Sequence, residues 1–455
     1  MGAGIAQLAC AGGMQTRLHD PVPDALERGS AAVGRGLAKL AEKGRLDDPE
    51  AAAGHLEAVA DLKGLAGCEL VIEAAPERAD LKRELFGRLS AVCGEGTVLA
   101  TNTSSIPVTS LAGAAKWPDR VVGMHFFNPP PLMRLLEVIP AVQTAPSALA
   151  LAAAAGKAMG KQVIVAADGP GFLVNRCGRP FSMEALRLVA EGVATPQQVD
   201  RICRMAGGFR MGPFELMDLV GIDVGLEVAR SFSELSFGEP RWRPSPLQAR
   251  MVAAGRLGRK TGNGWYSYDD GPHRPEDPSP LAPPSPQNLP ARAAQAGSEL
   301  VSCAPASLGS QRRPRACGYV LLPPAGSLVE LTRTPSTPER SCRRVEQLCA
   351  RAGLHHEWVE DAPGLVLGRI VSQLVNEALF AIGEGVGSAE DVDLGLTLGL
   401  NHPRGPVEWG QAIGFDRVLR TIDGLWEERR EERYRAAPLL RSAAREGDVP
   451  PAPPR

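Results

Sequence analysis

The sequence lacks any apolar stretch long enough to cross a lipid bilayer, which would take about 18 consecutive apolar residues. Its beginning also lacks the basic segment that precedes the apolar core of a signal peptide. A net charge of -2 leaves no basic excess that would attract nucleic acid or an anionic membrane surface. We therefore expect a cytoplasmic protein that has neither nucleic acid nor a membrane as a partner.

Cysteine pairs with the spacing of metal ligands are missing as well. The nine cysteines are scattered along the chain, and none belongs to a C-x-x-C motif. An odd number of widely separated cysteines argues against a disulfide framework and against a zinc site. We therefore expect no bound metal and a reducing compartment.

Proline, in contrast, is abundant, and much of it is concentrated in two places. The segment "GPHRPEDPSPLAPPSPQNLP" at 271–290 is too rich in proline for a regular element, and we interpret 271–297 as a linker. The chain ends in "VPPAPPR", and we expect 446–455 to be a disordered tail.

Short apolar segments that end in polar residues alternate with helical stretches in the first third of the chain. Residues 2–12 are expected to form one helix, and a long amphipathic helix is expected near 22–43. The alternation is typical of a parallel sheet with crossover helices and predicts an α/β Rossmann-type domain over 1–167. The apolar segments are 14–20, 68–77, 96–105, 120–129 and 161–168.

The following, helical part of the chain repeats itself at an offset of 193 residues. The segment "DGPGFLVNR" (168–176) returns as "DAPGLVLGR" (361–369). The repeat predicts two copies of one all-α domain, at 168–270 and 361–445. The segment 298–360 between them is expected to be a reduced relative of the first sheet domain. We expect the two helical copies to pack against each other within one chain.

Five motifs resemble those of the 3-hydroxyacyl-CoA dehydrogenase family, in the family's order and spacing, over roughly residues 1–270. They are "NTSSIPVTSLA" (102–112), "GMHFFNPPPLMRLLEVI" (123–139), "DGPGFLVNR" (168–176), "GPFELMDLVGID" (212–223) and "RKTGNGWYSY" (259–268).

The resemblance implies oxidation of an (S)-3-hydroxyacyl-CoA to the 3-oxoacyl-CoA with NAD, in fatty-acid β-oxidation or in aromatic catabolism. The second helical copy resembles longer bacterial members, such as the dehydrogenase that acts on 3-hydroxyadipyl-CoA in phenylacetate breakdown. The substrate partner would be an acyl-CoA of undetermined chain length, and the chain could associate with further copies of itself.

Oxidising a secondary alcohol requires a base for the hydroxyl proton. His125 follows the apolar segment "VVGM" and has an unperturbed pKa near neutrality, as such a base requires. By itself it could equally be a structural histidine, and Glu137 could be an exposed strand residue. The resemblance implies that His125 is the base and that Glu137 pairs with its imidazole.

Ser104 and Asn175 resemble the pair that orients the substrate in the family, although either could be a cap or turn residue. The repeat has Gly368 at the position of Asn175 but keeps the next arginine, as Arg176 and Arg369. The scaffold therefore does not require the asparagine. We also expect the second copy to have lost its counterparts of the catalytic histidine and glutamate, which leaves one active site per chain.

For the cofactor, Asp20 ends the strand that follows the first helix. A carboxylate at that place binds both ribose hydroxyls and repels a 2′-phosphate, so we expect NAD rather than NADP. The alternative is an ordinary turn aspartate before Pro21. Gly2 resembles the third glycine of the nucleotide motif, which allows close packing of helix and strand.

Further contacts are implied by the resemblance alone. Glu77, Lys82, Asn128 and Lys260 match cofactor-binding positions of the family, and Lys43 matches a contact to the phosphates of CoA. Each of these residues could instead be an ordinary surface residue.

Two other functions stay open at this level. A sugar-acid dehydrogenase of the same superfamily would share the sheet domain but would lack the second helical copy. A catalytically impaired scaffold would need only the fold, although drift rarely spares a whole set of catalytic side chains.

The segment "MGAGIAQ" (1–7) matches the end of the family's glycine motif, G-x-G-x-M-G-x-G followed by "IAQ". We expect that the natural protein begins earlier, with a first strand and two more glycines that this chain lacks; a genuine truncation is the alternative.

We predict that a chain extended by an apolar strand and G-x-G binds NAD more tightly than the 455-residue chain. The added glycines let the backbone approach the pyrophosphate, and the added strand covers sheet edges. Calorimetric titration of both chains with NAD measures the difference, and equal affinities would contradict the expectation.

Overall fold

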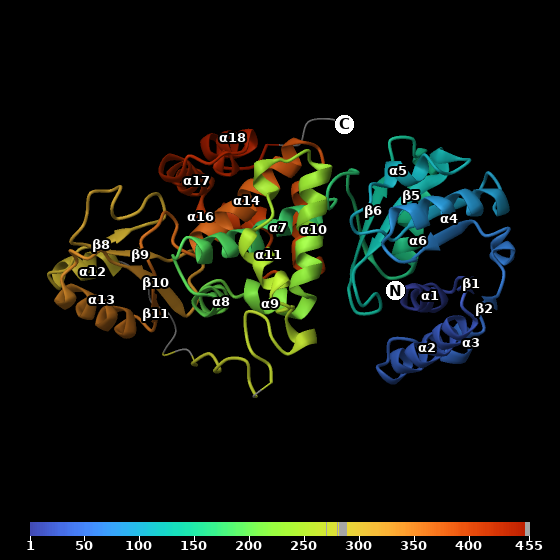
Figure 1. Ribbon diagram of the computed structural model, residues 1–455, viewed down its shortest axis with the longest axis horizontal. Helices are drawn as coiled ribbons and strands as arrows, with labels where there is room; N and C mark the ends of the chain where they lie inside the picture. The colour runs from blue at the N-terminus through green and yellow to red at the C-terminus, as the bar shows by residue number, and fades with distance from the viewer. Residues whose placement is uncertain (270, 280, 282–288, 451–455) are drawn as a thin grey trace. The chain divides into compact units, whose positions relative to one another are not determined.

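The computed structural model describes residues 1–269, 271–279, 281 and 289–450. The chain divides into two compact units, Met1–Val174 and Asn175–Arg455. Figure 1 shows the first unit in blue to teal and the second in green to red.

The first unit is an α/β domain, as the sequence predicts. Five strands form one sheet in the order β3-β4-β5-β6-β7, and β1 pairs with β2 in a separate parallel sheet. The elements are α1 (Gly2–Ala11), β1 (Thr16–His19), α2 (Pro23–Glu42), α3 (Pro49–Ala53), β2 (Leu56–Val59), β3 (Leu70–Glu73), α4 (Ala79–Val92), β4 (Val98–Thr101), α5 (Val108–Ala112), β5 (Val121–Phe126), β6 (Leu135–Pro140), α6 (Pro146–Ala158) and β7 (Gln162–Val165).

The sheet is not wholly parallel, contrary to the sequence-based expectation. Strand β6 runs antiparallel to β5, and their register places His125 opposite Glu137. The eight residues between these two strands are too few for a crossover helix, so the chain reverses directly. This reversal is what brings the two polar side chains into one pair.

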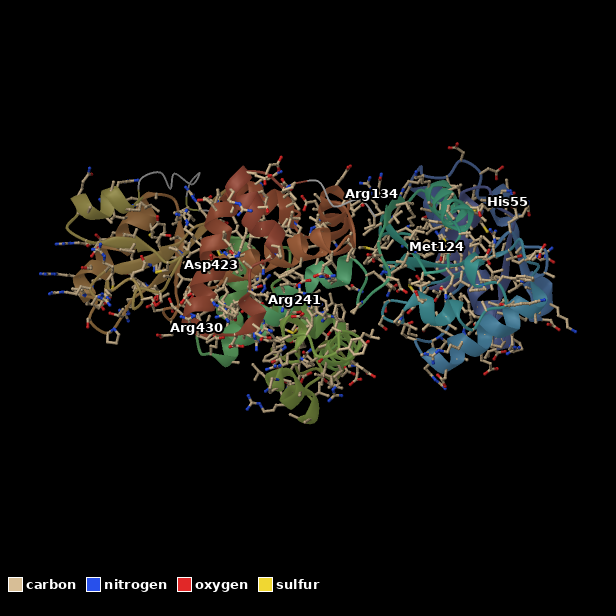
Figure 2. The ribbon with its side chains drawn as sticks, turned by 90° about the horizontal axis from the view of Figure 1, so that it is seen from above. His55, Met124, Arg134, Arg241, Asp423 and Arg430 are labelled. Atoms are coloured by element: carbon tan, nitrogen blue, oxygen red, sulfur yellow. The ribbon has the colours of Figure 1, made fainter. Side chains whose placement is uncertain are left out.

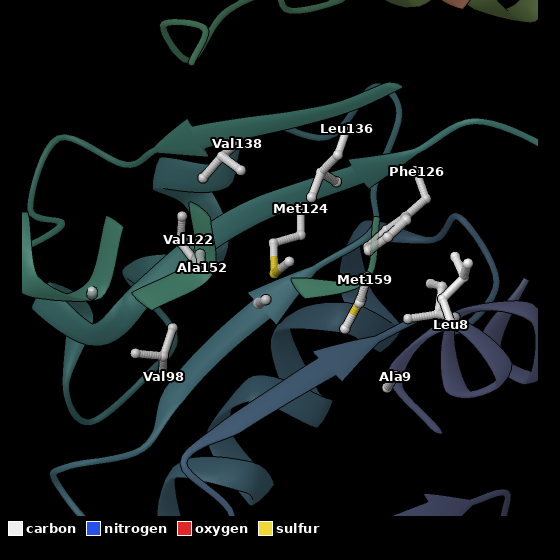
Figure 3. Close-up of a cluster of buried hydrophobic side chains, with 13 residues drawn as sticks. Leu8, Ala9, Val98, Val122, Met124, Phe126, Leu136, Val138, Ala152 and Met159 are labelled. Carbon is white, nitrogen blue, oxygen red and sulfur yellow. The ribbon is translucent and has the colours of Figure 1, made fainter. Parts of the chain in front are cut away.

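A continuous apolar core fixes the five-stranded sheet. Helix α1 contributes Leu8 and Ala9, which pack with Met124 and Phe126 of β5 and with Met159 beyond α6 (Figure 3). The opposite side of α1 packs on α2 through a second apolar cluster. Helix α1 therefore links the five-stranded sheet to the part of the unit that holds β1 and β2.

The second unit contains two helical bundles and a small sheet between them in the sequence. The first bundle comprises α7 (Val174–Ala190), whose first residue closes the first unit, α8 (Pro196–Met205), α9 (Pro213–Val220), α10 (Ile222–Leu235) and α11 (Pro246–Ala253). The second bundle comprises α14 (Leu367–Gly383), α15 (Ala389–Gly399), α16 (Pro406–Ile413), α17 (Phe415–Arg429) and α18 (Pro438–Glu446).

The two bundles use equivalent aspartates to join successive helices. Asp200 accepts the backbone N–H groups at the start of α9, at 2.8 Å each. Asp393, its counterpart at the offset of 193 residues, does the same for α16, at 2.8 and 3.0 Å. The repeat seen in the sequence is therefore a repeat of structure.

The bundles pack on each other through reciprocal ion pairs. Arg176 of α7 binds Glu377 of α14 at 2.8 Å, and Arg369 of α14 binds Glu184 of α7 at 2.7 Å. All four side chains are nearly or fully buried. Arg241, labelled in Figure 2, adds a further bond to Glu377. The expected pairing of the two copies within one chain is present.

A four-stranded sheet in the order β11-β10-β9-β8 occupies the segment between the bundles. Its elements are α12 (Leu289–Gln295), β8 (Leu300–Ser302), β9 (Cys317–Val320), β10 (Leu328–Thr332), α13 (Glu339–Arg351) and β11 (His355–Trp358).

The expected linker at 271–297 is more structured than its proline content predicts. Helix α12 forms at its end and packs on α13. His273 and Arg274 bind Glu215, and Asp277 binds Arg204, so this segment is tied to the first bundle by charge. Residues 280 and 282–288, and 451–455 of the expected tail, lie outside the described residues.

Cysteines, metal-binding side chains and long apolar helices can be compared across the described part of the chain. The described cysteines form no disulfide with one another. Within the described ranges, three or more metal-binding side chains never gather in one place. Of the helices described, none has the length and apolarity that crossing a membrane demands.

We predict that His402 makes the second unit sensitive to acid. It contacts the rings of Phe181 and Phe209 across the interface between the bundles, and burial lowers its pKa to about 4. The unfolded chain takes up the proton below about 6.5, so stability present at higher pH is lost as the pH falls toward 4.

At pH 5 this loss should be about 2 kcal/mol. Urea unfolding of the wild type and His402→Phe at pH 7.5 and pH 5 measures it. Phenylalanine is the matched substitution because Phe209 occupies the same place in the first copy. An identical pH dependence of both proteins would contradict the prediction.

Candidate active site

The centre of the site is a buried pair on two neighbouring strands. His125 Nδ1 lies 2.7 Å from Glu137 Oε2, and the two residues are opposite each other in the β5–β6 register. His125 is 6% exposed and Glu137 is fully buried. A carboxylate at this distance holds Nδ1–H, so that Nε2 is the nitrogen left to accept a proton.

Glu137 also holds the beginning of α7. Its second oxygen, Oε1, accepts the backbone N–H groups of Leu173 and Val174 at 3.1 and 3.0 Å. Both oxygens of the buried carboxylate therefore accept hydrogen bonds. One binds the imidazole, and the other binds the start of a helix. This satisfies the requirement that a buried charge be paired and hydrogen-bonded.

Apolar rings surround the imidazole. Phe127 and Phe172 lie with their ring centroids 4.6 and 5.8 Å from that of His125. Among the described residues, none forms a hydrogen bond with His125 Nε2. The geometry therefore leaves Nε2 of His125 able to accept a proton while a carboxylate holds Nδ1, in largely apolar surroundings.

A second carboxylate, that of the partly exposed Glu77, organises the loop that carries Ser104. Glu77 Oε1 accepts the Thr103 hydroxyl at 2.6 Å and the backbone N–H groups of Ser104 and Ser105 at 2.9 and 3.0 Å. Burial opposes ionisation, but the hydrogen bond from Thr103 and the charge of Lys82 keep the pKa of Glu77 below its usual value. Ser104 itself is exposed at the tip of this loop.

Lys82 acts within this arrangement and not at the surface. Its side chain is 1% exposed, and its ammonium group binds Glu73 at 2.7 Å and Glu77 at 3.3 Å. Any effect of Lys82 on a cofactor would therefore pass through Glu77. The sequence analysis did not include Glu73 in the site. A glutamate at the end of a strand gives no indication that a lysine nine residues later will form an ion pair with it.

Sequence reasoning also missed Asp168. Its two carboxylate oxygens accept the N–H groups of Val108 and Thr109. These residues begin α5, directly after the loop that carries Ser104. Its counterpart Asp361 holds the N–H groups of 308 and 309 in the same way. The retained aspartate at the start of both repeat motifs was the signal.

The residues expected to bind the adenosine half of NAD fit that role. Asp20 lines a cavity of about 520 Å³, with apolar neighbours that include Leu26 and Ala58. Its Oδ1 accepts the N–H of Val22, so the carboxylate also makes the turn that was the alternative interpretation. Helix α1 begins at Gly2 with no side-chain cap, which leaves its first N–H groups free for a phosphate.

The remaining predicted residues are not among the contacts described above. Asn128 follows β5 and is exposed, and Lys43 is exposed at the end of α2. Asn175 and Lys260 belong to the second unit. Asn175 lies in the first turn of α7, and Lys260 forms an ion pair with Asp223 at 2.6 Å.

The second copy corrects one expectation. Glu330 of β10 is opposite Val320 of β9, as Glu137 is opposite His125, and lies at the offset of 193 residues from Glu137. Both oxygens of Glu330 accept the N–H groups that begin α14, at 2.7 and 3.1 Å. The histidine is lost, as expected, but the glutamate is kept.

The reason is that this glutamate holds a helix whether or not a histidine is present. Without an imidazole partner, burial raises the pKa of Glu330 to about 8. The second copy therefore keeps the glutamate of the pair without the histidine.

Comparison with known proteins supports these observations. The family model for the NAD-binding domain of 3-hydroxyacyl-CoA dehydrogenase matches residues 1–169, and the model for the C-terminal domain matches 171–268 and again 364–452. The chain belongs to the 3-hydroxyacyl-CoA dehydrogenase family. The repeated match of the C-terminal model falls on the two helical bundles and leaves out the sheet between them.

Several relatives cover different shares of the chain. The 3-hydroxyadipyl-CoA dehydrogenase of Escherichia coli (strain K12) is 36% identical over 98% of this chain and 95% of its own. The mitochondrial hydroxyacyl-coenzyme A dehydrogenase of Sus scrofa is 38% identical over 59% of this chain and 88% of its own. The crystal structure of 3-hydroxybutyryl-CoA dehydrogenase from Escherichia coli K12 has a TM-score of 0.89, at 34% identity over 98% and 96% of the two chains.

The protein is thus an oxidoreductase that uses NAD and acts on 3-hydroxyacyl-CoA substrates. The sequence-based predictions of family, fold class, cofactor and reaction are confirmed.

We predict that Glu137→Gln and Glu330→Gln differ in activity. At 137 the amide can still accept the helix N–H groups, but its NH₂ side would face Nδ1 and favour the tautomer with the proton on Nε2. That imidazole cannot accept a proton, so kcat should fall about 10²- to 10⁴-fold. At 330 no histidine is present, so the rate of NADH formation should be unchanged.

Thermal melting of both variants is the control for folding. Equal rates for the two variants would show that Glu137 serves only to hold its helix.

Proposed function

We propose that His125 is the catalytic base in the oxidation of an (S)-3-hydroxyacyl-CoA to the 3-oxoacyl-CoA. The observation that carries this assignment is the buried His125–Glu137 pair, whose Nε2 is free while Nδ1 is held at 2.7 Å. The hydride acceptor in the reaction is the nicotinamide ring of bound NAD.

The residues of this chain handle the proton and the developing charge. His125 Nε2 takes the proton of the substrate hydroxyl, and the imidazolium that forms is stabilised by Glu137. Ser104 and Asn175 bind the hydroxyl and thioester oxygens and so orient the reacting carbon. Phe127 and Phe172 limit water around the imidazole, which strengthens each of these electrostatic interactions.

The cofactor is held along the first unit. Asp20 binds the adenosine ribose and disfavours a 2′-phosphate, and the beginning of α1 at Gly2 binds the pyrophosphate. Glu77, supported by Lys82, and Asn128 contribute near the nicotinamide end. Lys260 is a further proposed cofactor contact.

We further propose that the chain has one active site. The second copy keeps Glu330 but has Val320 and Gly368 in place of His125 and Asn175. Its role is to support the first bundle through the buried ion pairs.

We also propose that Lys43 contacts the phosphates of CoA. The chain works in the cytoplasm, in fatty-acid β-oxidation or in phenylacetate and related aromatic catabolism.

We predict that His125→Gln lowers kcat by two to four orders of magnitude, because proton transfer then has no base. The affinity for NAD should change little, since the imidazole is not among the groups proposed to bind the cofactor. NADH absorbance with 3-hydroxybutyryl-CoA and 3-hydroxyadipyl-CoA measures the rate, and calorimetry measures NAD binding.

A parallel loss of turnover and of NAD affinity would mean that the histidine is structural. Wild-type protein without turnover on any chain length would refute the proposed function.

A further inference from the structure

Arg179 is a cation without an anionic partner in the helix that carries Asn175. It follows Asn175 by four residues in α7, so the two side chains lie on the same face of that helix. Its guanidinium lies over the ring of Phe232 of α10, 4.8 Å from the centroid. No carboxylate in the described residues lies within ion-pair distance, and its half-buried side chain has a buried Nε with no hydrogen-bond partner.

Buried arginines elsewhere in the second unit are neutralised. Arg176, Arg204, Arg241 and Arg369 each bind at least one carboxylate, at 2.8, 2.6, 2.8 and 2.7 Å. Arg179 binds no carboxylate of the described ranges, and burial without compensation lowers its pKa to about 10. A half-buried cation in this state gains more from an incoming anion than an exposed one does.

The surroundings of Arg179 are apolar. Phe232 belongs to a cluster with Met183, Trp242 and the partly buried Val228. Val224, one turn before Val228 in α10, is 46% exposed. An apolar surface therefore leads along α10 toward the unpaired guanidinium.

The second copy shows that the fold does not need Arg179. At the offset of 193 residues, Arg179 is replaced by Ser372 and Phe232 by Leu425, just as Asn175 is replaced by Gly368. The residues that hold the two bundles together are kept over the same stretch. Between the two copies, Arg179 therefore differs, as the proposed substrate residue Asn175 does, whereas the residues that join the bundles are the same.

We propose that Arg179 binds a carboxylate at the far end of the acyl chain, which makes a dicarboxylic 3-hydroxyacyl-CoA the preferred substrate class. This inference rests on the proposed function, since it takes Asn175 to bind the thioester end. Residues four apart in a helix have Cβ atoms about 5–6 Å apart, a distance that a few methylene groups span. The guanidinium supplies the two parallel donors that a carboxylate accepts.

The test compares two CoA esters of the same length, 3-hydroxyadipyl-CoA and 3-hydroxyhexanoyl-CoA, which differ by a terminal carboxylate or methyl group. Wild-type protein should favour the adipyl ester roughly 10- to 100-fold in kcat/KM. Arg179→Met should abolish this preference mainly through KM, and leave the hexanoyl ester unaffected. Arg179→Lys should restore part of it.

The matched control is Arg230→Met, which removes an exposed arginine of α10 that pairs with Glu227. With this variant, kcat/KM for both CoA esters should equal the wild-type values. Calorimetric Kd values for the two esters form a second measurement that does not depend on turnover.

The outcomes separate the two proposals. If neither ester is oxidised but the adipyl ester binds more tightly than the hexanoyl ester and Arg179→Met removes the difference, the carboxylate site stands and the proposed function fails. If both are oxidised but wild type shows no preference, or Arg179→Met weakens both equally, the carboxylate site is refuted and the function stands.

Discussion

The candidate active site depends on one buried carboxylate, Glu137, whose two oxygens bind different parts of the chain. One orients His125 and the other holds the first N–H groups of α7. A buried charge is tolerated only when it is paired and hydrogen-bonded. The same requirement therefore fixes the tautomer of His125 and the start of the helix that carries Asn175. The geometry of the candidate site and the local folding of the chain share one interaction here.

Comparing the two copies within the chain separates the two roles of this glutamate, which are to orient the histidine and to hold the start of a helix. Glu330 keeps the helix-holding duty in the second copy after the histidine has become Val320. The reciprocal pairs of Arg176 with Glu377 and Arg369 with Glu184 then join the copies. Removing one partner of such a buried pair costs about 3–5 kcal/mol, so these residues are constrained by stability alone. Residues that differ between the copies are the ones free to serve chemistry.

Much of the fold follows from local patterns. The apolar segments and the long amphipathic helix α2 formed where periodicity predicted them, and the 193-residue repeat gave the second bundle. The antiparallel β6 was not expected, because an apolar segment does not record the direction in which it enters a sheet. Helix α12 formed in the expected linker because its one proline, Pro290, lies in the first turn, where proline is tolerated, and the helix packs on α13.

The sequence by itself determined the family, the reaction, the cofactor and the candidate catalytic residues, because each is carried by residues close together in a motif. Only the tertiary structure decided which oxygen of Glu137 binds which group, that Lys82 is buried, that Glu330 holds the start of a helix and that Arg179 has no carboxylate partner among the described residues. These facts depend on contacts such as Arg176 with Glu377, which are 201 residues apart. No local pattern encodes such a contact, because it exists only when folding brings two distant side chains into the same low-dielectric interior.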